Sequence, residues 1–163
     1  HNPQGDNMFD IEEIDVIGKA DKGFTFDILN SQDEQTGAKI TIAGVYGKKG
    51  KDCRVKYEAK ERELLRKFNL TGKKIEEINK KVEEKEPVEE EAVKSLMEYE
   101  DALEDAYIKT ILVPMTIAVE GLKMGGEEFV LNDKNVFALY KKYPTVLGQA
   151  MREIYNVENL AKN

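Results

Sequence analysis

The sequence predicts an α+β protein, in which a small N-terminal antiparallel β-hairpin or sheet packs on a mainly α-helical C-terminal body. Near the N-terminus, apolar and polar residues alternate as in a half-buried strand, with Phe24, Phe26 and Ile28 on one side. After residue 50 the apolar residues instead recur every three or four positions, as in amphipathic helices. The 163 residues, 40% of them hydrophobic, suit one domain with a sizeable core.

The domain organisation follows from composition along the chain. Residues 1–7 are polar and precede Met8, so we expect an expression remnant or a disordered tail there. Residues 8–163 are expected to form a single domain. Within it, the lysine- and glutamate-rich segment at about 70–91 predicts a charged, peripheral helical arm or insertion.

The N-terminal half predicts strands followed by a helix. Met8–Gly18 is interpreted as one short strand, whereas Lys22–Leu29 and Ile40–Tyr46 are expected to pair as an antiparallel hairpin that needs cover on its apolar face. Gly47–Lys51 lacks the phosphate-loop pattern and is interpreted as a solvated turn. Asp52 is expected to cap the next helix, whose inward stripe includes Tyr57, Glu61, Leu64, Leu65 and Phe68.

The C-terminal half predicts mostly helices. After a break at 69–72, Lys73–Glu86 has a thin apolar stripe and should end before Pro87. Glu89–Val113 is the longest predicted helix, kinked or ended at Pro114. The apolar segment Ile111–Val119 is expected to be buried. A glycine-rich turn, a short strand at Phe129–Leu131 and two short helices should follow, the first capped by Asn132 or Asp133 and the second starting at Thr145 after the Tyr143-Pro144 break.

Charge and cysteine content exclude several classes of function. A formal charge of −7 argues against a general nucleic-acid or anionic-membrane binder. The acidity is local, because Lys73–Asp105 holds six lysines against thirteen acidic residues and so carries the charge of the whole chain. A single cysteine excludes an internal disulfide and fits a reducing cytoplasm.

The sequence contains no recognisable catalytic constellation. His1 is the only histidine, and Cys53 has no histidine to activate it, so Cys53 is expected to be a packing residue. No Cys/His spacing or EF-hand loop indicates a metal, and no motif indicates a cofactor. The acidic run Glu83–Glu91 could hold a divalent ion, but a solvated helix start explains it better. We therefore expect a protein that is not an enzyme.

Two apolar patterns are candidates for a partner or oligomer surface. One is the apolar face of the predicted hairpin, and the other is a stripe along the longest helix that could be either core or interface. The candidate residues are Phe24, Phe26, Ile40, Ile42, Leu96, Tyr99, Leu103 and Tyr107.

Ile117–Leu160 resembles the C-terminal part of tailed-phage tail assembly chaperones, and the hairpin leading into a long charged helix is similar to the family's N-terminal layout. Two departures are the absence of tryptophan, where the family has an aromatic residue near Ala118-Val119, and the apparent insertion at Lys73–Glu91. The matched motifs are Glu120-Gly121-Leu122, Gly125-Gly126, Phe129-Val130-Leu131, Asn135-Val136-Phe137-Ala138-Leu139-Tyr140, Tyr143-Pro144, Gln149 and Asn159-Leu160.

The resemblance implies a non-enzymatic assembly factor of the bacterial host cytoplasm that is not expected in the mature virion. It implies binding to the tape measure protein, whose apolar helices the chaperone keeps soluble, and recruitment of major tail protein subunits. A homo-oligomer is a further expectation, and neither nucleic acid nor membrane is an expected direct partner. The alternative hypothesis is an acidic phage or mobile-element inhibitor that mimics nucleic acid to capture a DNA-binding protein.

Overall fold

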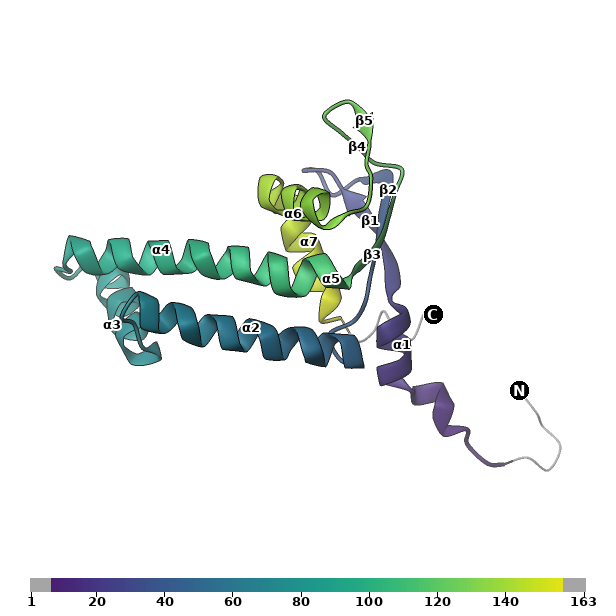
Figure 1. Ribbon diagram of the computed structural model, residues 1–163, viewed down its shortest axis with the longest axis horizontal. Helices are drawn as coiled ribbons and strands as arrows, with labels where there is room; N and C mark the ends of the chain where they lie inside the picture. The colour runs from purple at the N-terminus through teal and green to yellow at the C-terminus, as the bar shows by residue number, and fades with distance from the viewer. Residues whose placement is uncertain (1–6, 157–163) are drawn as a thin grey trace.

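The computed structural model describes residues 7–156 and has the predicted α+β architecture, with a small antiparallel sheet joined to a helical body (Figure 1). A long helical hairpin projects from one side of the sheet, and a short N-terminal arm projects from another (Figure 1). In chain order the elements are a 3-10 helix Ile11–Ile14, α1 Val16–Lys22, β1 Phe24–Leu29, β2 Gln35–Ile42, α2 Lys48–Lys67, α3 Gly72–Glu83, α4 Glu90–Tyr107, a π-helix Ile108–Leu112, α5 Val113–Met115, β3 Thr116–Glu120, β4 Lys123–Met124, β5 Glu127–Glu128, α6 Asp133–Lys142 and α7 Pro144–Ile154.

The main sheet has the order β1-β2-β3, and both neighbouring pairs are antiparallel. The predicted pairing of two antiparallel strands is confirmed, with Phe24 opposite Ile42 and Phe26 opposite Ile40. The bounds of the second strand were wrong, because β2 is Gln35–Ile42 and not Ile40–Tyr46. The third strand was not predicted: Val119 lies opposite Ile40, so a segment after the long helices pairs with a strand near the N-terminus. This pairing makes β2 the central strand.

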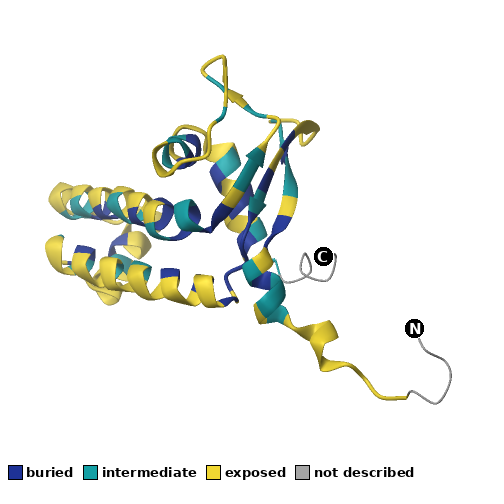
Figure 2. Cartoon of the chain, turned by 45° about the vertical axis from the view of Figure 1, so that its right-hand side comes forward, coloured by how far each residue is buried: buried dark blue, intermediate teal, exposed yellow. Residues whose placement is uncertain are grey.

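The main core lies among the sheet, the π-helix Ile108–Leu112, α6 and α7, where the buried residues gather (Figure 2). Ile40 and Ile42 of the central strand are fully buried there, as is Tyr140 of α6. The Tyr140 hydroxyl lies 2.7 Å from Thr116 Oγ1, which also donates to the Leu112 carbonyl. Every polar atom of this buried pair thus has a partner, as a close-packed core requires.

Gln149 of α7 joins the helical body to the sheet. Its Oε1 accepts a hydrogen bond from the Leu29 N–H at 2.9 Å, and its Nε2 donates to the Leu29 carbonyl at 3.0 Å. The side-chain amide therefore pairs with β1 as a neighbouring strand would, at the point where the β1–β2 register shifts. This position explains why a buried polar residue is tolerated here.

Helices α2 and α4 run antiparallel and form the projecting hairpin (Figure 1). Their contacts include an edge-to-face pair of Tyr57 and Tyr107 with ring centroids 5.4 Å apart, and a second of Phe68 and Tyr99 at 6.4 Å. Leu64 and Leu96 are buried in the second core that fills this interface. The apolar stripes predicted on both helices therefore face each other.

The longest helix ends next to Pro114, as the sequence predicts. Helix α4 continues through the π-helix into α5, which ends one residue after Pro114. Proline has no N–H and its ring crowds the carbonyl four residues earlier, so a widened turn directly before it relieves that conflict. Within the adjoining apolar segment Ile111, Leu112 and Met115 are buried, but Ile117 is exposed, so the predicted burial is only partial.

The strand predicted at Met8–Gly18 is wrong, because this segment holds the 3-10 helix and α1 instead. The Asp10 carboxylate accepts from the Glu12 N–H at 3.0 Å, and the Asp15 carboxylate accepts from the Gly18 N–H at 2.9 Å. The first N–H groups of a helix have no carbonyl of an earlier turn to bind, and these two carboxylates accept their hydrogen bonds.

The solvated turn predicted at Gly47–Lys51 is also wrong, because Gly47 is the N-cap of α2 and the next four residues form its first turn. Asp52 lies inside the helix and caps nothing at its start; instead the Asp21 carboxylate accepts from the Lys49 N–H at 3.1 Å. Gly50 is buried against the Val45 backbone. The sequence could not show that a capping carboxylate comes from another helix.

Around the glycine-rich turn, the strand predicted at Phe129–Leu131 is wrong, since the small strands are β4 and β5. They flank Gly125 and Gly126, whose φ angles of 65° and 84° favour glycine. The starts of the last two helices agree with prediction to within one residue: Asn132 caps α6 through the Asn135 N–H at 2.8 Å, and α7 starts at Pro144, one residue before the predicted Thr145.

Candidate protein-binding surfaces

The eight residues predicted as a partner or oligomer surface lie inside the folded chain or against it. Six are buried, namely Phe24, Ile40, Ile42, Leu96, Tyr99 and Tyr107, and the other two, Phe26 and Leu103, are half-buried. The hairpin residues Phe24, Phe26, Ile40 and Ile42 pack against the helical body, and the residues on α4 pack against α2. In the single chain the stripe at 96–107 is therefore core, and a surface for a partner has to be sought elsewhere.

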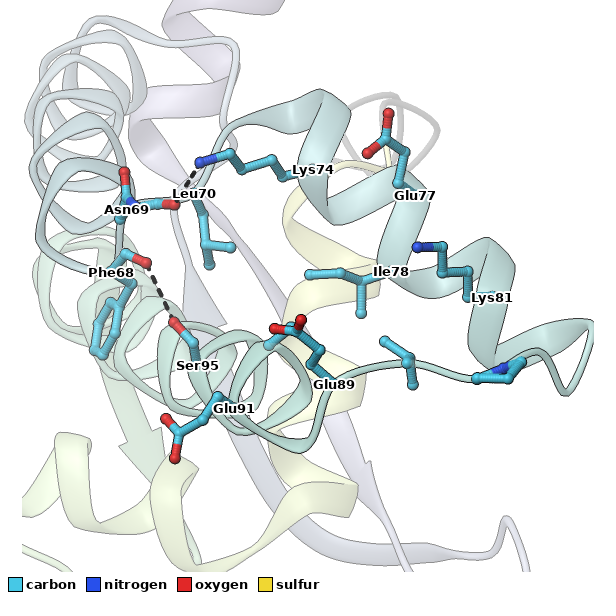
Figure 3. A pocket seen from close by; sticks show the side chains of 13 residues that line it. Phe68, Asn69, Leu70, Lys74, Glu77, Ile78, Lys81, Glu89, Glu91 and Ser95 are labelled. Carbon is cyan, nitrogen blue, oxygen red and sulfur yellow. Dashed lines mark hydrogen bonds between the residues drawn. The ribbon is translucent and has the colours of Figure 1, made fainter.

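A groove between α3 and α4 is the first candidate (Figure 3). Its volume is about 810 Å³, and it lies where the α2–α4 hairpin turns through α3. The apolar lining is Phe68, Leu70, Ile78, Pro87, Val88 and Ala92. The polar lining is Asn69, Lys74, Glu77, Lys81, Glu89, Glu91 and Ser95.

Local interactions hold the walls of this groove in place. Asn69 has a φ of 52° and turns the chain out of α2, and Thr71 caps α3 by accepting from the Lys74 N–H at 3.1 Å. Ser95 of α4 donates to the Phe68 carbonyl at 3.2 Å, which ties α4 to the end of α2 (Figure 3). Lys74 Nζ reaches back to the Asn69 carbonyl at 3.3 Å.

The groove combines apolar residues, of which Leu70 and Ile78 are already buried in the second core, with a rim that carries both charge signs. Lys74 and Lys81 lie on α3, and Glu89 and Glu91 lie at the start of α4 (Figure 3). Amphipathic helices bind in grooves of this kind, burying apolar side chains at i, i+3, i+4 and i+7 while charged residues pair with the rim. The arrangement is suited to binding a helix.

The N-terminal arm is a second unusual surface. Five large apolar side chains are more than half exposed within ten residues, which is rare outside binding segments. They are Met8, Phe9, Ile11, Ile14 and Ile17. Residues 8–18 also hold four carboxylates and no lysine or arginine, so the arm is both apolar and acidic.

The titratable groups of the core have structural explanations. Cys53 is buried, and this burial raises its thiol pKa, which favours the unreactive thiol form. Burial also raises the pKa of Tyr57 and of Tyr140 to about 12. Burial raises the pKa of Tyr107, and the nearby Tyr155 raises it further, although the Tyr107 hydroxyl has no partner in hydrogen-bond geometry among the described residues.

Within residues 7–156, no group of three or more His, Cys, Asp or Glu side chains is arranged to hold a metal ion. The same residues contain no helix that is both long and apolar enough to cross a membrane. His1 lies outside the described residues, as does the Asn159-Leu160 motif.

Neither the groove nor the N-terminal arm is predicted as a surface from the sequence, and each has a physical reason. The groove draws its lining from the turn between α2 and α3, from α3, and from the start of α4, and the sequence shows its α3 wall only as the thin stripe that includes Ile78. The arm was misassigned as a strand, although Ile11, Ile14 and Ile17 have the three-residue spacing of a helix. This three-residue spacing is the sequence signal that indicates a helix in the arm. Comparisons with protein-family models, curated proteins and solved structures found no match to this chain.

Proposed function

We propose that this protein is a non-enzymatic phage tail assembly chaperone that binds the tape measure protein and helps recruit tail tube subunits. The observation that carries the proposal is the α3–α4 groove, whose apolar floor and mixed-charge rim suit an amphipathic helix. The resemblance at Ile117–Leu160 supplies the identity of the partner. On this proposal the protein acts in the cytoplasm of the bacterial host and is absent from the mature virion.

The groove supports this function because of what an assembly chaperone has to do. A tape measure protein with apolar helices needs those helices covered until the tail tube encloses them. A groove of about 810 Å³ has room for several apolar side chains, while the open charged rim allows release. Affinity then depends on a few apolar anchors, and rim charges chiefly tune the association rate.

Co-expression with the tape measure protein of the same phage tests the proposal. The wild-type chain should recover a soluble complex by pull-down. Ala92→Phe places an aromatic ring in the groove without deleting a core side chain, and it should weaken complex formation tenfold or more. Asn79→Phe is the matched control, because Asn79 is exposed on α3 and does not line the groove, and it should bind as the wild type does.

Two results would contradict the proposal. One is failure of the folded wild-type chain to capture a soluble tape measure protein. The other is equal capture by the wild type and Ala92→Phe, with both shown to be folded by circular dichroism, because the groove would then have no part in binding.

A further inference from the structure

The side of α4 that faces away from α2 carries a second groove, which we call the outer groove. Its volume is about 520 Å³, and its floor is formed by Val88, Val93 and Met97. Val88 and Val93 are half-buried against the second core, whereas Met97 is 61% exposed and belongs to neither core. The fold therefore holds the floor in place while its centre remains open to solvent.

The rim of the outer groove is acidic. It consists of Glu90, Glu98 and Asp101 together with one lysine, Lys94, which gives a formal charge of −2. Within the described part of the chain, none of these four side chains has an ion pair. An exposed apolar floor thus lies beside negative charge that the chain itself does not neutralise.

Helix electrostatics explains only one end of this rim. Glu90 lies in the first turn of α4, where a carboxylate is stabilised by the helix dipole. Glu98 and Asp101 lie further along the helix, gain nothing from the dipole at its start, and repel each other at the i, i+3 spacing. Solubility requires surface charge, but it does not require carboxylates around an exposed methionine. A positively charged partner would relieve the repulsion and cover the methionine at the same time.

The outer groove is accessible in the folded chain. The first half of α4 projects beyond α6 and α7, and its neighbours are α2 and α3 (Figure 1). Those two helices lie against its inner side, where Leu96 and Tyr99 are buried. The outer groove opens on the other side of α4, so a partner can reach it without any rearrangement of the fold.

We infer that the outer groove binds a basic amphipathic helix of a partner protein. Apolar side chains of that helix cover Val93 and Met97, and lysine or arginine residues on its flanks approach Glu98 and Asp101. The stripe from Glu90 to Asp101 is roughly 17 Å long at about 1.5 Å per residue, so about three turns of a helix match it. The acidic rim disfavours nucleic acid, anionic membranes and acidic helices, because each would bring further negative charge to it.

This inference goes beyond the proposed function, because the outer groove is separate from the α3–α4 groove. Val88 lines both grooves, but they open on different sides of α4. Ala92 and Ser95 line only the α3–α4 groove, and Val93 and Met97 line only the outer groove. The protein can therefore hold two helices next to each other at the start of α4.

Fluorescence anisotropy with the full chain and a labelled designed peptide of about 18 residues tests the inference. The peptide carries leucine at positions i, i+3, i+4 and i+7 of a helix and lysine on its other sides. The wild type should bind it, more weakly as salt rises from about 0.05 to 0.5 M, because salt screens the rim. A second peptide with the same lysines but glutamine for each leucine should bind at least about tenfold more weakly, because it lacks the apolar contact.

A substitution in the floor shows whether the peptide occupies the outer groove. Met97→Gln removes the exposed apolar side chain without a change of charge and should weaken binding about tenfold. Val55→Gln is the matched control, because Val55 on α2 is 59% exposed and lines neither groove, and it should bind as the wild type does. Ala92→Phe, which fills the α3–α4 groove, should also leave peptide binding unchanged.

A change in the rim tests the role of the carboxylates. Glu98→Gln/Asp101→Asn should weaken binding about fivefold in low salt, and the difference should shrink in high salt. The matched control is Glu127→Gln/Glu128→Gln, which removes two exposed carboxylates of β5 and should bind as the wild type does.

The inference is overturned if the wild type does not bind the leucine–lysine peptide in low salt, or if the glutamine peptide binds equally well, since charge alone would then act. Equal binding by Met97→Gln and the wild type, or equal weakening in the matched controls, would also overturn it. Loss of peptide binding in Ala92→Phe would place the helix in the α3–α4 groove instead. If the free wild type forms a dimer that Met97→Gln abolishes, the occupant is a second copy and the inference is wrong. None of these measurements involves the tape measure protein, so a negative result leaves the proposed function to its own pull-down test.

Discussion

Gly50→Ala should destabilise the protein, although alanine is the better helix former. Gly50 lies in the first turn of α2, and a β-carbon built there would lie 2.3 Å from the Val45 carbonyl oxygen and 2.6 Å from its carbon. Both are backbone atoms, so no side-chain rotation can relieve the contact. The chain has to move α2 away from the segment that connects it to β2.

The two opposing effects can be compared in magnitude. Replacing glycine by alanine inside a helix gains about 1 kcal/mol of helix propensity. Overpacking against a rigid neighbour costs about 3 kcal/mol when the backbone has to shift. We therefore expect Gly50→Ala to lower the free energy of unfolding by about 2 kcal/mol. Gly148→Ala is the matched control: Gly148 lies inside α7, and no atom of another described segment lies within 4 Å of the added β-carbon, so the same substitution should stabilise by up to about 1 kcal/mol.

Urea denaturation followed by far-ultraviolet circular dichroism measures both changes, provided that the slope with denaturant stays the same. A Gly50→Ala protein as stable as the wild type, or more stable, would refute the close packing of α2 on Val45. That result is what a solvated turn at Gly47–Lys51 would give. The experiment therefore separates the observed structure from the interpretation that sequence alone supports.

Two further predictions concern the contacts between the sheet and the helical body. Gln149→Leu removes both hydrogen bonds to Leu29 and leaves its N–H and carbonyl without those partners, so it should lower the free energy of unfolding by about 2–4 kcal/mol in the same assay. The exposed Gln35→Leu should change it by less than about 0.5 kcal/mol, and equal effects of the two would contradict the bridging role. Burial raises the pKa of Tyr140 from 10.0 to about 12, so its contribution is complete below pH 10 and is lost between pH 10 and about 12, as the unfolded chain ionises first. Relative to Tyr140→Phe, the wild type should therefore lose about 2–3 kcal/mol over that range, and parallel stability curves for the two proteins would exclude this ionisation.

The elements predicted correctly from the sequence are those specified by neighbouring residues. The alternation at Phe24–Ile28 determines a strand whose partner follows directly along the chain. Asn132 determines a helix start because its side chain reaches an N–H three residues away, and Pro114 determines a helix end because it lacks a donor. In each case the cause and its effect lie within a few residues of each other.

The elements that the sequence did not reveal depend on residues far apart in the chain. The start of α2 is capped by Asp21, and β3 becomes a strand because β2, more than seventy residues earlier, offers a free edge. The candidate surface residues on α4 likewise depend on a segment far away in the chain. The stripe at Leu96–Tyr107 was visible as apolar, but only the packing of α2 decided that it is core.

The sequence by itself determined the α+β class, most helices and the absence of a recognisable catalytic motif, because these depend on local periodicity and residue type. Only the tertiary structure decided which apolar residues remain exposed. The periodicity of a helix shows that one face is apolar and the other polar, but it does not show which segment covers the apolar face. The antiparallel packing of α2 on α4 buries one stripe of each helix and leaves the other sides of both helices exposed.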